Sequence, residues 1–301
     1  MTLTDIAKMT EDDAREYLEK LRWPHGPVCP HCESNNVTRL HGEKHRAGTI
    51  QCNGCREQFT VTVGGVMESS HIPLVKWVLA FHLLCSSKKG MSALQLQREL
   101  NLGSYRTAWF MAHRIRHAME GQPMQEQLKG YVEADETYVG GKPRYKGQSK
   151  RGRGTKKAAV MVLVERDGNS VCKPIPRVTR KELGGEIRKC VSEKAMLITD
   201  EFQVYNGIGK HFEGGHESVN HGRKEYVRMT AGGLSVHTNT AESFNALIKR
   251  GHYGVYHQMS KKHLHRYCSE FSFRWNHRKT NDSARTEAAL RQAEGKRLTY
   301  A

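Results

Sequence analysis

The sequence of 301 residues lacks any long apolar run, and this absence excludes one class of protein. A membrane-spanning helix needs about 20 consecutive apolar residues, and no stretch approaches that length. The first 18 residues, MTLTDIAKMTEDDAREYL, contain acids and no apolar core, so we do not expect them to act as a secretory signal. Internal repeats are also absent. We therefore expect a protein without a membrane partner, located in the cytoplasm.

Acidic residues are too few to balance the basic ones. The chain has 48 Lys and Arg against 31 Asp and Glu, which gives a formal net charge of +17, and its pI is near 9.6. This excess is larger than solubility requires, so it favours a polyanionic partner, and nucleic acid above all. The hydrophobic fraction of 37% is low, but the length suffices for about two domains with a buried core.

Cysteines are present in a pattern that favours metal over disulfides. Four of the eight form two CxxC pairs: Cys29 with Cys32, and Cys52 with Cys55. Each pair places two thiolates on one tight turn, and four thiolates satisfy a structural zinc ion, whereas a catalytic zinc keeps one open position. With short strands expected at 37–40 and 58–63, the segment predicts a zinc ribbon in a reducing compartment. Redox pairs or unrelated thiols are the alternative, which the spacing disfavours.

Residues 92–119 have the pattern of a helix-turn-helix. Two helical stretches flank Asn101-Leu102-Gly103, and Ser104 or Thr107 is placed to cap the second. That second stretch carries Arg106 and Arg114, which we expect to contact DNA. A helical hairpin without DNA binding is the alternative.

A basic segment at 142–157, KPRYKGQSKRGRGTKK, has no acid. Its glycines predict a loop, and its position after a candidate catalytic strand favours contacts to phosphates by Lys150, Arg151 and Arg153. The alternative is a solvated charged loop.

From residue 131 the pattern changes to alternating strands and helices. Strands are expected at 131–135, 158–164, 171–178 and 195–199, and helices at 180–192, 239–250 and 260–278. This order predicts an α/β layer domain over about 130–280.

Three acids in this region stand out by their context. Asp135 lies in the strand-like Tyr131–Val139, where strand alternation puts Glu133 on its face and Glu136 on the other. Asp200 ends an apolar strand, and Glu242 lies near the start of a helix. Such acids can converge on a pair of divalent cations for phosphoryl transfer. The alternatives are a buried ion pair for Asp135, a helix cap for Asp200, and a capping box with Asn239 for Glu242.

Several motifs together resemble those of the ISXO-like insertion-sequence transposases, which are DDE-type enzymes with an N-terminal zinc ribbon and are related to the Merlin transposases. The matching segments are Asp135-Glu136-Thr137-Tyr138-Val139-Gly140-Gly141-Lys142, Asp200-Glu201, His237-Thr238-Asn239-Thr240-Ala241-Glu242-Ser243-Phe244, Lys249-Arg250-Gly251 and Gly254-Val255-Tyr256-His257. The resemblance covers about residues 10–280. One departure is Asn245, which stands where the family pattern has an aromatic residue.

The resemblance implies a ribonuclease-H-like catalytic domain, a mixed sheet flanked by helices, with an acid triad and magnesium, or manganese in its place. Asp135 and Asp200 match the first two family acids, and Glu242 matches the third, with Asn239 one turn earlier as the fallback ligand. Lys249 matches the family's basic residue seven positions on, and Arg250 beside it is expected to contact DNA.

We therefore expect five segments: an N-terminal helix at 1–27, a zinc ribbon at 28–66, a helix-turn-helix-like module at 67–125, a ribonuclease-H-like transposase domain at 126–280 and a tail at 281–301. The function expected is that of an insertion-sequence transposase, which cuts element ends and joins them to target DNA by two-metal phosphoryl transfer. Its partners are double-stranded DNA and further copies of itself, as a homodimer or higher assembly on the bacterial nucleoid. A zinc-ribbon regulator without catalysis and a nuclease on the same fold are the alternatives.

Overall fold

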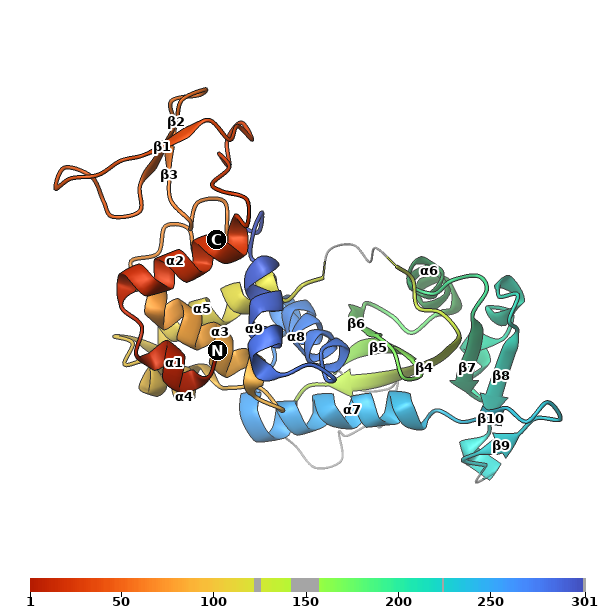
Figure 1. The fold of residues 1–301 in the computed structure, drawn as a ribbon. Helices are drawn as coiled ribbons and strands as arrows, with labels where there is room; N and C mark the ends of the chain where they lie inside the picture. The colour runs from red at the N-terminus through yellow and green to blue at the C-terminus, as the bar shows by residue number, and fades with distance from the viewer. Residues whose placement is uncertain (122–125, 142–156, 224, 300–301) are drawn as a thin grey trace. The chain divides into compact units, whose positions relative to one another are not determined.

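The computed structural model describes residues 1–121, 126–141, 157–223 and 225–299, and the chain divides into two compact units (Figure 1). Unit 1 comprises Met1–Glu120 and Thr280–Ala301, and unit 2 comprises Gly121–Lys279. Unit 1 is therefore built from both sides of unit 2 in the sequence. The basic residues Lys150, Arg151 and Arg153 lie outside the described residues.

Unit 1 is mainly helical. Its helices are α1 (Leu3–Ala7), α2 (Glu11–Arg22), α3 (Leu74–Ser86), α4 (Ala93–Glu99), α5 (Tyr105–Ala118) and α9 (Asp282–Arg291). The segment 1–27 is predicted as one N-terminal helix, but two form because Thr10 begins a new one: its hydroxyl accepts from the Asp13 backbone N–H, and the Asp13 carboxylate accepts from the Thr10 N–H. This capping box gives hydrogen-bond partners to two backbone N–H groups that would otherwise lack one at the start of a new helix.

The predicted zinc ribbon is a three-stranded antiparallel sheet in the order β1-β2-β3. Its strands are β1 (Val37–Arg39), β2 (Ile50–Cys52) and β3 (Gln58–Phe59). The register pairs Val37 with Cys52 and Ile50 with Phe59. Cys52 thus ends the central strand, and the turn that follows carries Cys55.

Helices α4 and α5 pack against each other as the helix-turn-helix pattern predicts. Ser104 caps α5, since its hydroxyl accepts from the Thr107 N–H. Leu96 is the fully buried leucine of α4, whereas Leu94 is 51% exposed.

The C-terminal residues, expected as a tail, form a helix that belongs to unit 1. Asn281 caps α9 by accepting from the Ala284 N–H, and Arg285 donates to the Cys85 carbonyl at 3.0 Å. Arg291 donates to the Leu21 carbonyl at 3.1 Å. These contacts join α9 to α3 and α2, which are distant in sequence.

Unit 2 contains a five-stranded mixed sheet in the order β6-β5-β4-β7-β8. The strands are β4 (Tyr131–Val139), β5 (Ala158–Glu165), β6 (Ser170–Ile175), β7 (Met196–Asp200) and β8 (His216–Val219). β4, β5 and β6 are antiparallel neighbours, whereas β7 runs parallel to both β4 and β8. A short hairpin of β9 (Arg228–Met229) and β10 (Ser235–Val236) precedes the last two helices. This mixed sheet confirms the ribonuclease-H-like fold.

Helices cover both faces of the sheet (Figure 1). α6 (Arg180–Cys190) packs on one face, and α7 (Asn239–Gly251) and α8 (Leu264–Asn276) pack on the other. The residues of β5 alternate between the two cores: Met161 and Leu163 face α6, while Val160 and Val162 face α7 and α8. A strand that is buried on both faces reads as a continuous apolar run, which explains why β5 carries almost no polar residue.

Among the residues that the structure describes, none of the helices combines the length and the apolar character needed to cross a membrane.

Candidate functional site

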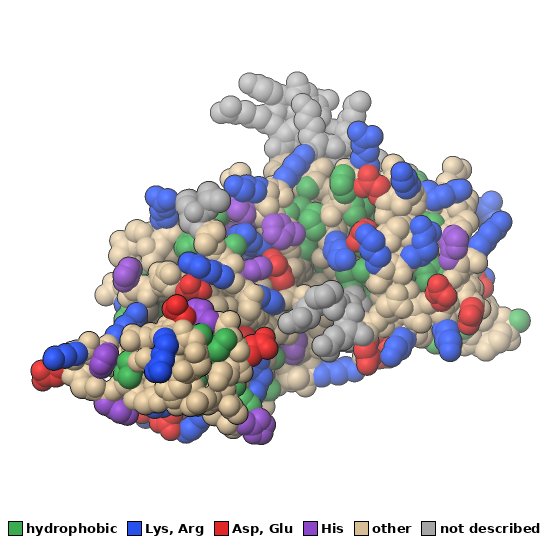
Figure 2. Space-filling view, turned by 90° about the horizontal axis from the view of Figure 1, so that it is seen from above, with side chains coloured by type: hydrophobic (Ala, Val, Ile, Leu, Met, Phe, Trp, Pro, Cys, Tyr) green, Lys and Arg blue, Asp and Glu red, His purple; other side chains and the backbone are tan. Residues whose placement is uncertain are grey.

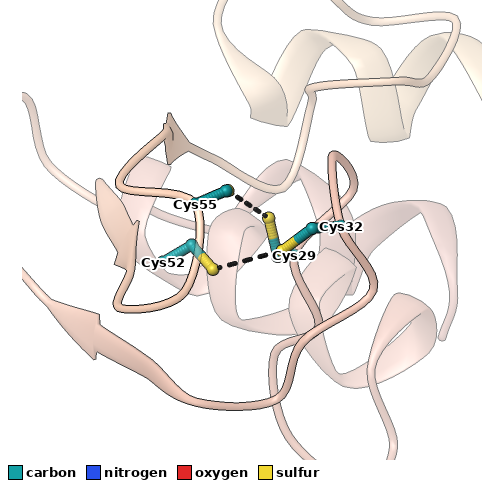
Figure 3. A group of neighbouring side chains, drawn as sticks. All are labelled: Cys29, Cys32, Cys52 and Cys55. Atoms are coloured by element: carbon teal, nitrogen blue, oxygen red, sulfur yellow. Dashed lines mark hydrogen bonds between the residues drawn. The ribbon is translucent and has the colours of Figure 1, made fainter.

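The four predicted zinc ligands meet in the ribbon of unit 1 (Figure 3). The Cys29 and Cys55 sulfurs are 3.7 Å apart, and the Cys32 and Cys52 sulfurs are 3.5 Å apart. Tetrahedral zinc with Zn–S bonds of about 2.3 Å requires sulfurs about 3.8 Å apart. The cluster therefore has the geometry of a structural zinc site, with all four positions taken by cysteine.

Backbone N–H groups of the two turns point at the thiols. The His31 N–H donates to the Cys29 sulfur at 3.4 Å, and the Cys55 N–H lowers the pKa of Cys52 to about 6. Thiolates are the ligands that zinc binds, so the second turn favours the ionised form of Cys52, while contact with the neighbouring sulfurs raises the pKa of Cys32 and raises the pKa of Cys55 to about 12 in the absence of metal. The His31 side chain is exposed and is not part of the cluster.

Asp135 lies on β4, on the face of the sheet that α7 covers. Its Oδ1 accepts from the Glu136 N–H at 2.7 Å, and its Oδ2 accepts from the Asn245 side-chain amide at 2.7 Å. Burial, together with the nearby carboxylates of Asp200 and Glu242, raises the pKa of Asp135 to about 6. The two other acids are therefore close enough to disfavour the charge on Asp135.

Asp200 ends β7, the parallel neighbour of β4. The register pairs Glu133 with Ile198, and both strands run in the same direction, so Asp135 and Asp200 lie two residues further along adjacent strands. Asp200 Oδ1 also accepts from the Phe202 N–H at 3.0 Å, which fixes the turn after the strand. Asp200 is not the helix cap considered from the sequence, because the short helix after it, Gln203–Tyr205, has Phe202 as its N-cap and no side-chain capping bond. Asp200 instead stabilises the turn and lies beside Asp135.

Glu242 lies in the first turn of α7, and its side chain is 54% exposed. The capping box with Asn239 does not form: the helix begins at Asn239 itself, the N-cap is Thr238, and that residue makes no side-chain capping bond. Glu242 Oε1 is instead 3.6 Å from Nε2 of His221, a residue that the sequence did not single out. Asn239, the fallback ligand, is exposed at the start of the helix.

The three acids form a more open group than the cysteines. In the described part of the chain, the cysteines alone form a group of potential metal ligands with all ligand atoms within 4.8 Å of one another. Carboxylate oxygens suit Mg²⁺, which binds few protein ligands and keeps several waters. Asp135, Asp200 and Glu242 fit that donor chemistry.

The predicted basic residues differ in exposure. Lys249 and Arg250 are exposed in the last turn of α7, and Arg106 is exposed in the first turn of α5. Arg114 is only 8% exposed, and its guanidinium lies over the rings of Phe110 and Trp77. Arg114 therefore packs inside unit 1, which leaves Arg106 as the accessible arginine of the expected pair.

Lys and Arg side chains are spread across the face of the molecule shown in Figure 2, with acids between them. The charge of +17 is thus not confined to one helix. A distributed positive charge suits the backbone of a nucleic acid.

Two residues of unit 2 contact the candidate site, although no functional role was predicted for them from the sequence. Glu133 is fully buried and accepts hydrogen bonds from the backbone of α7. Asn245, noted only as a departure from the family pattern, bonds to Asp135 directly. A buried glutamate two residues before a candidate catalytic acid was the available signal for the first.

Comparisons with known proteins agree with the fold and the cysteine cluster. Residues 127–276 match the ISXO2-like transposase domain, and residues 9–58 match the transposase zinc-ribbon domain. An uncharacterized protein in transposable element ISH50 of Halobacterium salinarum is 30% identical over 282 residues, which cover 88% of this chain and 91% of that protein. The chain belongs to the ISXO2-like transposase family.

A solved structure, that of a pre-cleavage Mos1 transpososome, matches with 11% identity over 97% of each chain and a TM-score of 0.26.

Proposed function

We propose that this chain is a DNA transposase that cuts DNA at the ends of its own element and joins those ends to target DNA. The observation that supports this most is the convergence of acids from β4, β7 and α7 around a partly buried carboxyl group, Asp135. Burying an acid next to two others is costly unless a cation compensates the charge. Membership of the transposase family indicates that a cation bound at these acids would serve phosphoryl transfer on DNA.

Asp135 and Asp200 would be the principal ligands of Mg²⁺, and Glu242 would close the site from the helix. Divalent metal in such a site activates water and stabilises the leaving oxygen in phosphoryl transfer. The buried strands β4 and β7 hold two ligands rigidly, whereas the exposed position of Glu242 leaves room for a DNA strand. Mn²⁺ would be accepted in place of Mg²⁺.

Two displacements would follow one another at this site. Water attacks a phosphodiester at the element end, the P–O3′ bond breaks, and a 3′-hydroxyl is freed. That hydroxyl then attacks a phosphodiester of the target, forms a new P–O bond and releases a target 3′-hydroxyl. Lys249, exposed two turns after Glu242 on α7, would contact a phosphate near the cleaved bond.

Duplex DNA would be held by exposed basic residues and by zinc-dependent recognition in unit 1. Arg106 and Arg250 are the exposed arginines that we assign to phosphates. Lys150, Arg151 and Arg153 are assigned the same role from the sequence. A homodimer or larger assembly would bring two element ends together.

The test is a supercoiled plasmid that carries the element's ends, incubated with the protein and Mg²⁺. Metal-dependent nicking at the ends followed by strand joining supports the transposase. Nicking without joining would favour a nuclease on the same fold. Specific binding without either product would favour a regulator.

A further inference from the structure

The carboxylate of Glu133 is fully buried and bonded on both oxygens. Oε2 accepts from the backbone N–H groups of Thr240 at 2.8 Å and Ala241 at 3.0 Å. Oε1 accepts from Arg166 Nε at 2.8 Å and from the Thr240 hydroxyl at 3.0 Å, and His237 Nδ1 lies 3.3 Å away. With these partners the carboxylate is already satisfied, so Glu133 is not a spare metal ligand.

Helix α7 has no capping side chain of its own. Its N-cap, Thr238, has φ −113° and ψ 18° rather than the extended backbone of a capping residue, and its hydroxyl lies 3.2 Å from His221 Nε2 instead. Six other helices are capped by their own N-cap residue: Thr2, Thr10, Ser92, Ser104, Thr179 and Asn281. The first N–H group of α7, that of Asn239, donates to His237 Nδ1, and the next two, those of Thr240 and Ala241, are satisfied from strand β4.

The contacts of Glu133 and Asp135 with α7 are in register. Glu133 and Asp135 are two residues apart on β4, or about 6.7 Å. Their partners on α7, Ala241 and Asn245, are four residues apart, or about 6 Å along the helix axis. The helix is thus attached to the strand at two successive points, by Glu133 at its first turn and by the Asn245–Asp135 hydrogen bond one turn later.

Resting on the proposed function, we infer that Glu133 is a positioning residue, which sets where α7 begins on β4 and thereby holds Glu242 and Asn245 beside Asp135. A helix turns by about 100° per residue. If the helix began one residue earlier or later against the strand, Glu242 would be carried away from Asp135. Arg166 strengthens the attachment, because it bonds Glu133 and also donates to the carbonyls of Ser235 and His237 just before the helix.

The test compares three Glu→Gln variants of the full-length protein. Glu133→Gln removes the charge of the attachment. Glu136→Gln makes the same change three residues later, on a side chain that accepts from the Tyr205 hydroxyl on the opposite face of the sheet. Glu11→Gln removes another carboxylate that caps a helix from a distance, since Glu11 accepts from the Leu74 N–H at the start of α3.

Mn²⁺ affinity is measured by calorimetry without DNA, together with the thermal midpoint, the dissociation constant for element-end DNA and the nicking rate at saturating DNA. We expect Glu133→Gln to weaken Mn²⁺ binding by about ten-fold or more and to lower the nicking rate, with DNA affinity unchanged. Glu136→Gln and Glu11→Gln lower the midpoint but keep the Mn²⁺ affinity. Equal Mn²⁺ affinities in Glu133→Gln and Glu136→Gln would overturn the inference.

Thr240→Val keeps the result decisive if Glu133→Gln does not fold. It removes only the hydroxyl bond to Glu133 Oε1, and we expect a fall of a few-fold in Mn²⁺ affinity. An unchanged affinity would count against the positioning role. Asp135→Asn separates the two claims: if it leaves Mn²⁺ binding intact, the proposed metal site fails, whereas its loss of binding beside an unaffected Glu133→Gln or Thr240→Val would reject this inference alone.

Discussion

The two candidate metal sites differ in how the chain builds them. The cysteine site uses two tight turns of one small ribbon, and its four sulfurs lie within 4.8 Å of one another. The acidic site draws Asp135, Asp200 and Glu242 from two strands and a helix, and it is more open. A closed set of four ligands holds a metal for structure, while an open set leaves metal positions for water and substrate.

The difference also lies in how each site tolerates the absence of its ion. The raised pKa values of Cys32 and Cys55 keep those thiols neutral beside Cys52, so the cysteines can lie together at little cost. The three carboxylates repel one another, and burial adds to the cost for Asp135. Zinc should therefore be needed for the cysteine ribbon to fold, whereas Mg²⁺ should reduce the repulsion among the three carboxylates. The following predictions test this contrast, from the largest expected effect to the smallest.

Asp135→Asn should abolish nicking and joining, by about a thousandfold or more, because an amide lacks the charge that divalent cations require. DNA binding should persist, and the metal-free protein should melt no earlier than the wild type, since a costly buried acid is removed. Gel-based cleavage assays with Mg²⁺ and Mn²⁺, beside a thermal melt, measure this. An active variant would remove the proposed mechanism.

Cys52→Ser should release the zinc and unfold the ribbon, because zinc binding and folding of such small modules are coupled. Metal analysis should fall from about one zinc per chain to none, and recognition of element ends should be lost. Cys85→Ser is the matched control, since Cys85 is a buried cysteine of α3 outside the cluster. Full zinc retention by Cys52→Ser would contradict the site.

Glu242→Gln should reduce nicking by about a hundredfold if this residue is the third metal ligand. The structure removes the alternative that the loss reflects a broken capping box, because α7 begins at Asn239. Asn239→Ala is the control and should retain most activity. If the two variants exchange these outcomes, Asn239 is the third ligand.

Mg²⁺ should stabilise the protein more at high pH than at low pH. The folded-state pKa of Asp135 is raised from 3.8 to about 6, so its ionisation opposes folding: the stability it contributes is complete below pH 3.8 and is lost as pH rises through about 6. The shift in melting temperature caused by Mg²⁺ should therefore be larger near pH 8 than near pH 5. This pH dependence should be absent from Asp135→Asn.

Arg106→Ala should weaken DNA binding by a few-fold and equally for all sequences, with the salt slope reduced by about one. The exposed position of Arg106 supports a phosphate contact. Binding measured over a series of salt concentrations gives both quantities. A change confined to element-end DNA would instead indicate base recognition.

The cysteine site could be predicted in full because its ligands follow from local spacing. The acids on β4 and β7 could also be identified from the sequence, because a charged residue in an otherwise apolar strand is unusual. The attachment of α7 to β4 could not be predicted from the sequence. Glu133 bonds to Thr240, which is 107 positions away, and Asp135 bonds to Asn245, which is 110 positions away. The periodicity of either segment alone carries no information about its partner.

The place of α9 in unit 1 could not be predicted from the sequence for the same reason. Its residues show a weak amphipathic pattern, and its place in unit 1 depends on Arg285 and Arg291 reaching carbonyls of α3 and α2. A local pattern cannot reveal such a return. Arg114 was misplaced for a similar reason, because a basic residue on a helix is expected outside until the rings of Trp77 and Phe110 are known to receive it.

The packing of α9 against α3 has a consequence for the order in which the chain folds during synthesis on the ribosome. The hydrogen bond from Arg285 to the Cys85 carbonyl joins positions 200 residues apart. At about 5–20 residues per second, the surface of α3 that receives α9 waits roughly 10 to 40 seconds for its partner to be synthesised. Unit 2 emerges in full during that interval, so the acidic site can assemble before unit 1 is complete. A nascent chain therefore acquires its candidate catalytic core before its N-terminal module is finished.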